Sequence, residues 1–190
     1  MHNIIKINSK ELHPIGIGTW GIGGFMETEK GGEEAAIEAL RYSIEKGQNH
    51  IDTAEMYGNG YAEEIIGQAI KGIERDKLFI ASKVHRNYGS SKDVLNATEK
   101  ILKRLQIDAL HMLYIHSYWE DENMDEWLEE ANKAVDRGLA KSLAVSNWTT
   151  ENLKWGIARS KNKIVANQIT ISCIKVRYRK KCKNCVRKMI

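Results

Sequence analysis

Four side chains of types that hold or transfer protons lie in the first part of the chain: Asp52, Tyr57, Lys83 and His116. Each alone has an ordinary structural explanation: a capping Asp, a Tyr that covers a turn, a solvent-facing Lys and a packed His. Three of them stand at or near the ends of apolar segments that suit β-strands, and Tyr57 follows the first of these. If the strands are parallel neighbours, all four side chains meet at one edge of the sheet, as a set that suits acid–base chemistry.

The segments that must position these residues alternate between strand and helix patterns. A short β-hairpin is expected first, with strands 4–7 and 12–15. Strands are then expected at 16–21, 49–54, 78–84, 109–115, 141–145 and 164–168, and amphipathic helices at 33–46, 62–71, 92–105, 125–137 and 149–160. Such strand–helix units predict an α/β protein with a parallel sheet.

Two architectures fit this alternation, a doubly wound open sheet and a (β/α)8 barrel. No G-x-G-x-x-G motif follows the first strand and opens a helix, and the glycine-rich segment 21–24 lies well before the helix expected at Glu33. Polar residues instead recur at the carboxyl ends of successive strands, where a barrel places its active site. We therefore predict a barrel of the (β/α)8 TIM type, with about six of its eight strand–helix units.

Composition excludes several classes of protein. The 190 residues are 42% hydrophobic and 28% charged, as in ordinary globular domains. No apolar run approaches the roughly 18 residues of a membrane-spanning helix, and the N-terminus has no signal-peptide core. Three cysteines form no disulfide framework, so a cytoplasmic location is expected. Cys182 and Cys185 form a lone C-x-x-C with only Cys173 nearby, too few ligands for structural zinc, so no metal is expected.

The net charge of +4 comes from one segment. Eight of the 29 Lys and Arg residues, and no acidic residue, lie in 169–190, which leaves residues 1–168 with 21 basic and 25 acidic side chains. A nucleic-acid partner is therefore not expected from the overall charge. We predict two parts: a partial barrel at 1–168 and a basic tail at 169–190.

Seven motifs, in order and suitably spaced, resemble the aldo-keto reductases. They are Gly-Thr-Trp-Gly (18–21), His-Ile-Asp-Thr-Ala-Glu-Met-Tyr-Gly (50–58), Ala-Glu-Glu-Ile-Ile-Gly (62–67), Ser-Lys-Val (82–84), Tyr-Ile-His (114–116), Val-Ser-Asn-Trp (145–148) and Asn-Gln (167–168). The resemblance runs from about residue 4 to residue 168. It implies an oxidoreductase that reduces an aldehyde or ketone to an alcohol by hydride transfer from NADP(H), with NAD as the alternative cofactor.

The resemblance also implies roles for the four ionisable residues. Tyr57 would be the general acid that protonates the carbonyl oxygen of the substrate. A free tyrosine has a pKa near ~10, and a nearby ammonium group, here Lys83, would lower it. Asp52 would keep Lys83 charged and oriented, and His116 would orient the carbonyl group.

Further residues would bind cofactor and substrate on the same grounds. Ser146, Asn147 and Gln168 resemble the residues that hold the nicotinamide carboxamide, and the cofactor set also includes Gly18, Thr19 and Trp20. Trp20, Tyr118 and Trp119 would line an apolar substrate pocket, with simple packing at the rim as the alternative. His50 and His111 are expected to be structural, and Glu63 to support a helix.

The segment 169–190 resembles nothing in the family, whose next two strand–helix units carry the loops that bind the cofactor phosphates. We therefore expect a C-terminally truncated member, with a catalytically inactive fragment of a frameshifted or decayed reductase gene as the alternative to the enzyme. Open sheet edges then predict self-association between chains. The expected partners are otherwise a small carbonyl substrate, with no nucleic acid and no membrane.

Overall fold

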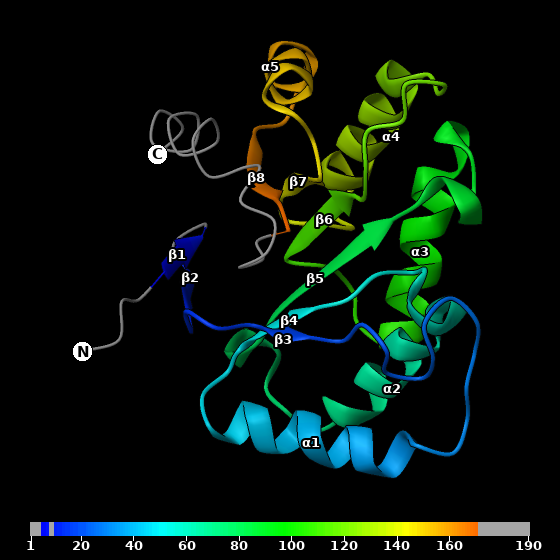
Figure 1. Cartoon of the computed structure of the whole chain (residues 1–190). Helices are drawn as coiled ribbons and strands as arrows, with labels where there is room; N and C mark the ends of the chain where they lie inside the picture. Colours follow the sequence, from blue (N-terminus) through cyan, green and yellow to red (C-terminus); the bar gives the residue numbers. More distant parts are fainter. Residues whose placement is uncertain (1–4, 8–9, 171–190) are drawn as a thin grey trace.

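Six parallel strands form one continuous sheet in the computed structural model, which describes residues 5–7 and 10–170 (Figure 1). The strands pair in chain order: β3 (Ile17–Gly18), β4 (His50–Asp52), β5 (Phe79–Val84), β6 (Met112–Ile115), β7 (Leu143–Ser146) and β8 (Ile164–Gln168). Each strand follows its neighbour after an intervening segment that contains a helix. The carboxyl ends of all six therefore lie along one edge of the sheet.

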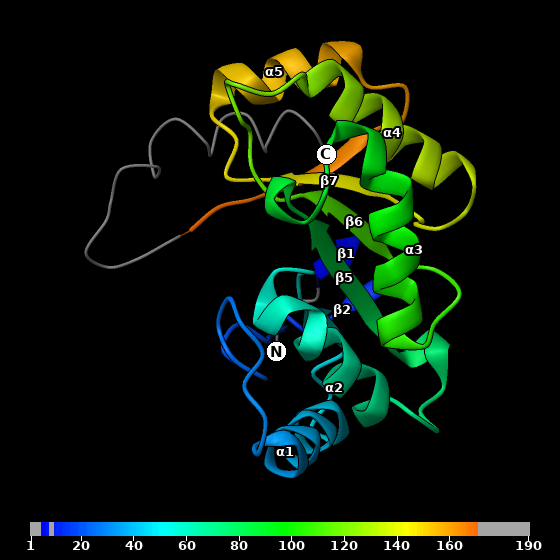
Figure 2. The same cartoon turned by 90° about the vertical axis from the view of Figure 1, so that its right-hand side faces the viewer.

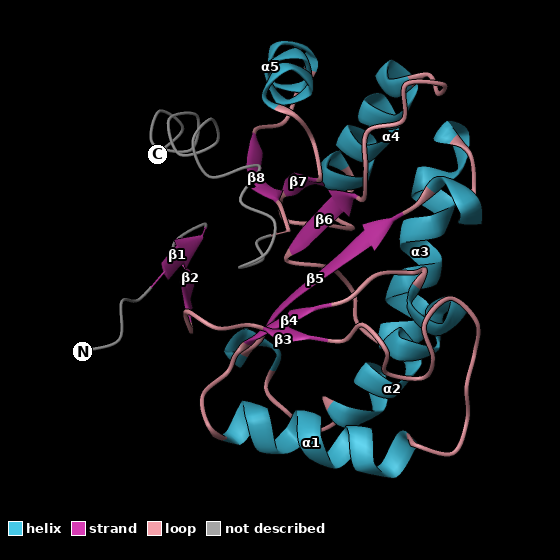
Figure 3. Cartoon of the chain, in the orientation of Figure 1, coloured by secondary structure: helices cyan, strands magenta, loops and turns pink. Residues whose placement is uncertain are grey.

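Five α-helices line one side of this sheet (Figures 2 and 3). They are α1 (Glu33–Glu45), α2 (Tyr61–Ala69), α3 (Val94–Leu105), α4 (Met124–Asp136) and α5 (Thr150–Arg159). Each expected helix is confirmed to within about two residues at its ends, the usual uncertainty of helix boundaries. The side chain of Thr149 caps α5 by accepting a hydrogen bond from the backbone N–H of Asn152, as its position predicted.

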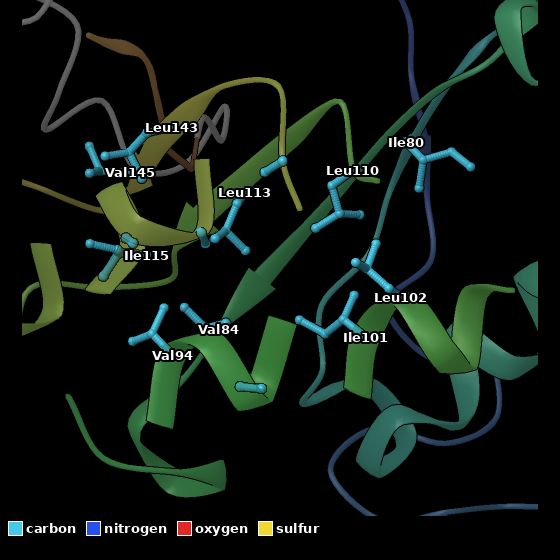
Figure 4. Close-up of a cluster of buried hydrophobic side chains, with 14 of the residues drawn as sticks. Ile80, Val84, Val94, Ile101, Leu102, Leu110, Leu113, Ile115, Leu143 and Val145 are labelled. Atoms are coloured by element: carbon cyan, nitrogen blue, oxygen red, sulfur yellow. The ribbon is translucent and has the colours of Figure 1, made fainter. Parts of the chain in front are cut away.

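The larger hydrophobic core lies between the sheet and the helices (Figure 4). Alternate strand residues such as Ile80, Leu113 and Val145 point to this side and meet Ile101 and Leu102 of α3 and similar residues of the other helices. All of these strand residues are fully buried. The core fixes which strand residues point away from the helices, and that opposite side is where Lys83 lies.

The second face of the sheet carries a smaller cluster covered in part by the hairpin. The hairpin strands β1 (Ile5–Ile7) and β2 (Lys10–Leu12) pair antiparallel, and Leu12 is buried with the inward residues Phe79, Met112 and Tyr114. The hairpin lies at the side where β5 begins (Figure 1). It therefore packs at the end of the sheet opposite to the carboxyl ends of the strands.

The second hairpin strand differs from the expected range 12–15, since it covers Lys10–Leu12. The cause is local: the backbone N–H of His13 donates to the side chain of Asn49 at 2.9 Å instead of to a strand, and Pro14 has no N–H to donate. His111 is structural, as expected. Its ring stacks on Phe79 at 5.0 Å, and its Nδ1 accepts from the backbone N–H of Ile80.

No helix in the described ranges is long and apolar enough to cross a membrane. The described residues also contain no group of three or more His, Cys, Asp or Glu side chains that could hold a metal ion. The three cysteines and the basic residues of the predicted tail lie outside the described ranges.

Candidate active site

Lys83 lies in the middle of a polar cluster at the carboxyl edge of the sheet. It belongs to β5, and its side chain is only 1% exposed. Its Nζ donates to both carboxylate oxygens of Asp52 at 2.9 Å and to the carbonyl oxygen of Thr53 at 2.8 Å. Burial lowers the pKa of Lys83, and the Asp52 carboxylate acts in the opposite direction. The carboxylate therefore favours a charged ammonium group in a buried position.

Tyr57 brings its hydroxyl to the same ammonium group. It begins the 3-10 turn Tyr57–Gly60, which follows β4, and its hydroxyl oxygen accepts from Nζ of Lys83 at 3.4 Å. The hydroxyl proton is therefore free to be donated elsewhere. Burial and the charge of Asp52 raise the pKa of Tyr57 to about 12. This direction is opposite to the expected lowering, because Asp52 offsets the charge of Lys83 and burial disfavours a phenolate.

His116 directly follows β6 and faces Tyr57, with 6.2 Å between ring centroids. Burial, followed by the charge of Lys83, lowers the pKa of His116 to about 3, so the ring is neutral at pH 7. Its Nδ1 is buried without a hydrogen-bond partner in the described part of the chain. The neutral imidazole can donate one hydrogen bond to a bound oxygen atom.

Three polar residues from β7 and β8 continue the same edge. Ser146 Oγ donates to the carbonyl oxygen of Gln168 at 3.2 Å, and the Asn147 backbone N–H donates to it at 2.8 Å. Asn147 has φ +60°, a left-handed conformation that asparagine tolerates better than most residues. Its Nδ2 donates to the carbonyl oxygen of His116 at 3.2 Å, which ties this group to the Tyr57 side of the site.

The residues present fit a nicotinamide carboxamide at this place. Among the described residues, Oδ1 of Asn147 and the side-chain amide of Gln168 make no hydrogen bond; at the edge of the sheet, Asn147 is exposed and Gln168 is partly exposed. A carboxamide has one acceptor oxygen and two donor hydrogens, which free amide groups can satisfy. The fit concerns the nicotinamide end of the cofactor.

The segment after β3 forms one wall of the site. Gly18 ends β3, and buried Thr19 donates from both its backbone N–H and its Oγ1 to the carbonyl oxygen of Asp52. Trp20 is 49% exposed, and its ring meets Tyr57 at 4.8 Å and Phe25 at 5.4 Å. Of these three, only Trp20 presents an apolar surface beside Tyr57.

Tyr118 and Trp119 lie differently from each other. Trp119 is 7% exposed and packs against Trp127 and His85. Tyr118 meets the rings of Trp148 and Trp155, on the side of α5. Their assignment to the substrate pocket stays a prediction.

Two buried acidic residues beside the site were not singled out by sequence reasoning as site residues. Glu55 is 4% exposed and accepts from the backbone N–H of His85; burial raises its pKa to about 7. Glu63 is fully buried and links α2 to the neighbouring elements, since it accepts from Ser82 Oγ at 2.5 Å and from Arg104 Nε at 2.6 Å. The sequence predicted that Glu63 supports a helix. It gave no such signal for Glu55, because a Glu in a loop is usually exposed to solvent.

Comparison with known proteins identifies close resemblances over most of the chain. The model of the aldo/keto reductase family matches residues 14–189. Aldo-keto reductase YhdN of Bacillus subtilis is 34% identical over 156 residues, which cover 75% of this chain and 46% of YhdN. Methylglyoxal reductase YeaE of Escherichia coli is 34% identical over 137 residues, 72% of this chain and 46% of YeaE.

Solved structures give the same result. A thermostable aldo-keto reductase in complex with epalrestat matches with a TM-score of 0.85 and 36% identity, over 89% of this chain and 62% of that one. An aldo/keto reductase from Klebsiella pneumoniae in complex with NADP and acetate matches with a TM-score of 0.70 and 35% identity, over 80% and 51%. These matches confirm the predicted fold class, a partial barrel of the TIM type with an N-terminal hairpin.

The chain spans about half the length of the curated relatives it matches, 46% of YhdN and of YeaE. The range matched by the family model runs through most of 169–190. The expected boundary after Gln168 therefore stays a prediction.

Proposed function

Because the chain belongs to the aldo/keto reductase family, we propose that it is an NADP(H)-dependent oxidoreductase that reduces a small aldehyde or ketone to the alcohol. The observation that carries the proposal is the buried ammonium group of Lys83, held between the Asp52 carboxylate and the Tyr57 hydroxyl. Structural relatives bound to NADP support the choice of cofactor. NAD is the alternative.

Tyr57 acts as the general acid in this proposal. Its oxygen accepts from Lys83, so its proton is directed to the carbonyl oxygen of the substrate. A pKa of about 12 keeps Tyr57 protonated at neutral pH until negative charge develops on that oxygen. The phenolate left behind is stabilised by Lys83, which Asp52 keeps charged. Neutral His116 donates a second hydrogen bond to the same oxygen and fixes its position.

A bound nicotinamide cofactor would supply the hydride for the carbonyl carbon. Ser146, Asn147 and Gln168 would hold its carboxamide, and Gly18, Thr19 and Trp20 would line the adjoining wall. Trp20 also lines the substrate pocket together with Tyr118 and Trp119. The hydrogen bond from Asn147 to the carbonyl oxygen of His116 then couples the position of the cofactor to that of the substrate.

The test is NADPH binding by the 190-residue chain, followed by carbonyl reduction in wild type and in Tyr57→Phe. The loss of the general acid should lower kcat by at least about 100-fold while NADPH still binds. Tyr42→Phe is the matched control, since Tyr42 is 60% exposed on α1. Binding without turnover in wild type would favour the inactive alternative, and equal rates in wild type and Tyr57→Phe would remove Tyr57 from the mechanism.

We also propose that copies of the chain self-associate. In the described sheet, β3 and β8 each pair with a neighbour on one side only. Unpaired strand edges are templates for pairing with another chain. Sedimentation velocity at rising protein concentration should show species larger than the monomer; a single monomeric species at all concentrations would contradict this.

A further inference from the structure

His85 occupies a prominent position at the mouth of the site that the mechanism above does not use. It follows β5 in extended conformation, with φ −135° and ψ 139°. Side chains two residues apart on an extended strand point to the same face, so His85 lies on the same face as Lys83, further toward the mouth. Its ring is 5.4 Å from that of His116 and 5.2 Å from that of Trp119, in edge-to-face geometry with both.

The hydrogen bonds of His85 decide which ring nitrogen carries the proton. Nδ1 accepts from the backbone N–H of Asn87 at 3.2 Å. Burial and the charge of Arg86 lower the pKa of His85, so the ring is neutral at pH 7 and its one proton is on Nε2. In the part of the chain that the structure describes, no group pairs with Nε2. The site therefore contains an N–H donor without a protein acceptor.

Glu55 and Asn87 hold this donor in place. The buried carboxylate of Glu55 accepts from the backbone N–H of His85, and Trp119 packs against the His85 ring. A donor that is fixed before a ligand arrives loses little conformational entropy on binding. Glu55 thus restrains the backbone of His85, while Asn87 and Trp119 restrain its ring.

We propose that His85 is a substrate-binding residue whose Nε2–H donates to a second oxygen, on the carbon next to the carbonyl group that Tyr57 and His116 hold. The preferred substrates are then carbonyl compounds with an adjacent hydroxyl or oxo group. This inference rests on the proposed reductase function. It follows because the donor lies beside His116, which contacts the carbonyl oxygen in that mechanism. A substrate without the second oxygen leaves the donor unpaired.

The test compares hydroxyacetone with butanone, which differ by a hydroxyl in place of a methyl group. His85→Phe keeps an aromatic ring against Trp119 and removes the donor; His85→Gln restores an N–H near the same place. In His85→Phe the ratio of kcat/KM for hydroxyacetone to that for butanone should fall about tenfold, the equivalent of one hydrogen bond. His85→Gln should recover most of the ratio. Equal losses for both ketones would mean a packing role and would overturn the proposal.

A second measurement does not depend on turnover. In the chain labelled with 15N-histidine, NMR spectra with NADP⁺ present follow the Nε2 resonance of His85 during titration with each ketone. Hydroxyacetone should shift it, and butanone should leave it nearly unchanged. The absence of a selective shift contradicts the inference about His85. Activity lost in all variants and in wild type, with the shift retained, contradicts only the proposed reductase function.

Discussion

Lys83 places a charge on the face of β5 whose other side chains, Phe79 and Ala81, are apolar. Its 1% exposure and its bidentate contact with Asp52 describe a buried ion pair, whose partners depend on each other. Burial of a charge is tolerable only while its partner is present. The main effect of the pair on stability therefore appears when one partner is removed, because the other charge is then left unpaired.

Asp52→Asn should destabilise the fold by about 3 kcal/mol, because it leaves the Lys83 ammonium group buried without a carboxylate. Urea unfolding measures the change. Lys83→Met should cost less, since it removes the charge that needs a partner. Asp121→Asn is the control, because the Arg86–Asp121 ion pair lies at the surface, and its stability should stay close to that of wild type. A loss no larger for Asp52→Asn than for the control would contradict the buried pair.

Glu55 predicts a pH dependence of stability. Its pKa is raised from 4.5 to about 7 by burial, so between these pH values the folded state binds more protons than the unfolded state. The contribution of Glu55 to the free energy of unfolding therefore falls as pH rises through this window. Glu55→Gln should match wild type near pH 5 and be more stable by about 2–3 kcal/mol at pH 8.

His111 and His116 have lowered pKa values, so they destabilise the fold as pH falls, opposite to Glu55. Both histidines are present in wild type and in Glu55→Gln, so the difference in stability between the two proteins at each pH excludes their effect. Denaturant unfolding at both pH values gives the result. A constant difference between wild type and Glu55→Gln across pH 5–8 would show that the carboxyl group does not titrate there.

At the scale of elements, helices α2 and α3 pack so closely at Gly67 that a larger residue does not fit there. A Cβ atom at Gly67 would lie 2.7 Å from the carbonyl oxygen of Arg104 and 3.0 Å from that of Leu105. These are backbone atoms of α3, which cannot turn aside as a side chain can. The α2–α3 contact thus depends on the absence of a side chain.

Gly67→Ala should destabilise the protein by about 2 kcal/mol, although alanine is the better helix former. Gln68→Ala, at the neighbouring exposed position of α2, should change stability little. Thermal melting of both variants tests this. Gly67→Ala more stable than wild type would mean that propensity outweighs the close approach.

The elements and part of the site follow from sequence because their signals are local. Asp52 and Lys83 stand at the ends of apolar runs, and strand periodicity is enough to bring them to one edge of the sheet. Glu55, which is buried, and His85, which is partly buried, were not predicted, because the residues that contact them are distant in sequence. The raised pKa of Tyr57 was also missed, since it depends on burial and on how fully Asp52 offsets Lys83.

At the scale of the whole molecule, the hairpin covers the inner face of the sheet at the end remote from the site. Leu12 is 3% exposed in the inner cluster, and Lys10 Nζ approaches Nε2 of His111 at 3.4 Å and donates to the carbonyl oxygen of Asp76. The hairpin therefore closes the end of the sheet remote from Tyr57, and its described residues make no hydrogen bond or ring contact with that side chain.

Leu12→Ala should lower the free energy of unfolding by about 3 kcal/mol, through lost burial and a cavity in the inner cluster. Ile15→Ala, at a position 64% exposed, should change it little. NADPH affinity of folded Leu12→Ala should equal that of wild type, as measured by fluorescence under native conditions. An affinity loss in Leu12→Ala would show that the hairpin influences the opposite end of the sheet.

The segment between β3 and α1 is fastened to the site through its main chain. The Gly58 N–H donates to the carbonyl oxygen of Phe25, and the Tyr88 hydroxyl donates to the carbonyl oxygen of Met26. The side chains of Phe25 and Met26 are 60% and 42% exposed. Because the acceptors are backbone carbonyl oxygens, replacement of the Phe25 and Met26 side chains removes neither hydrogen bond. In the proposed reductase, residues 25 and 26 can therefore change beside Trp20, which Phe25 contacts, without disturbing the main chain that holds them near Tyr57. A library randomised at positions 25 and 26 should yield altered substrate ranges at nearly constant stability, which makes this segment a natural starting point for directed evolution.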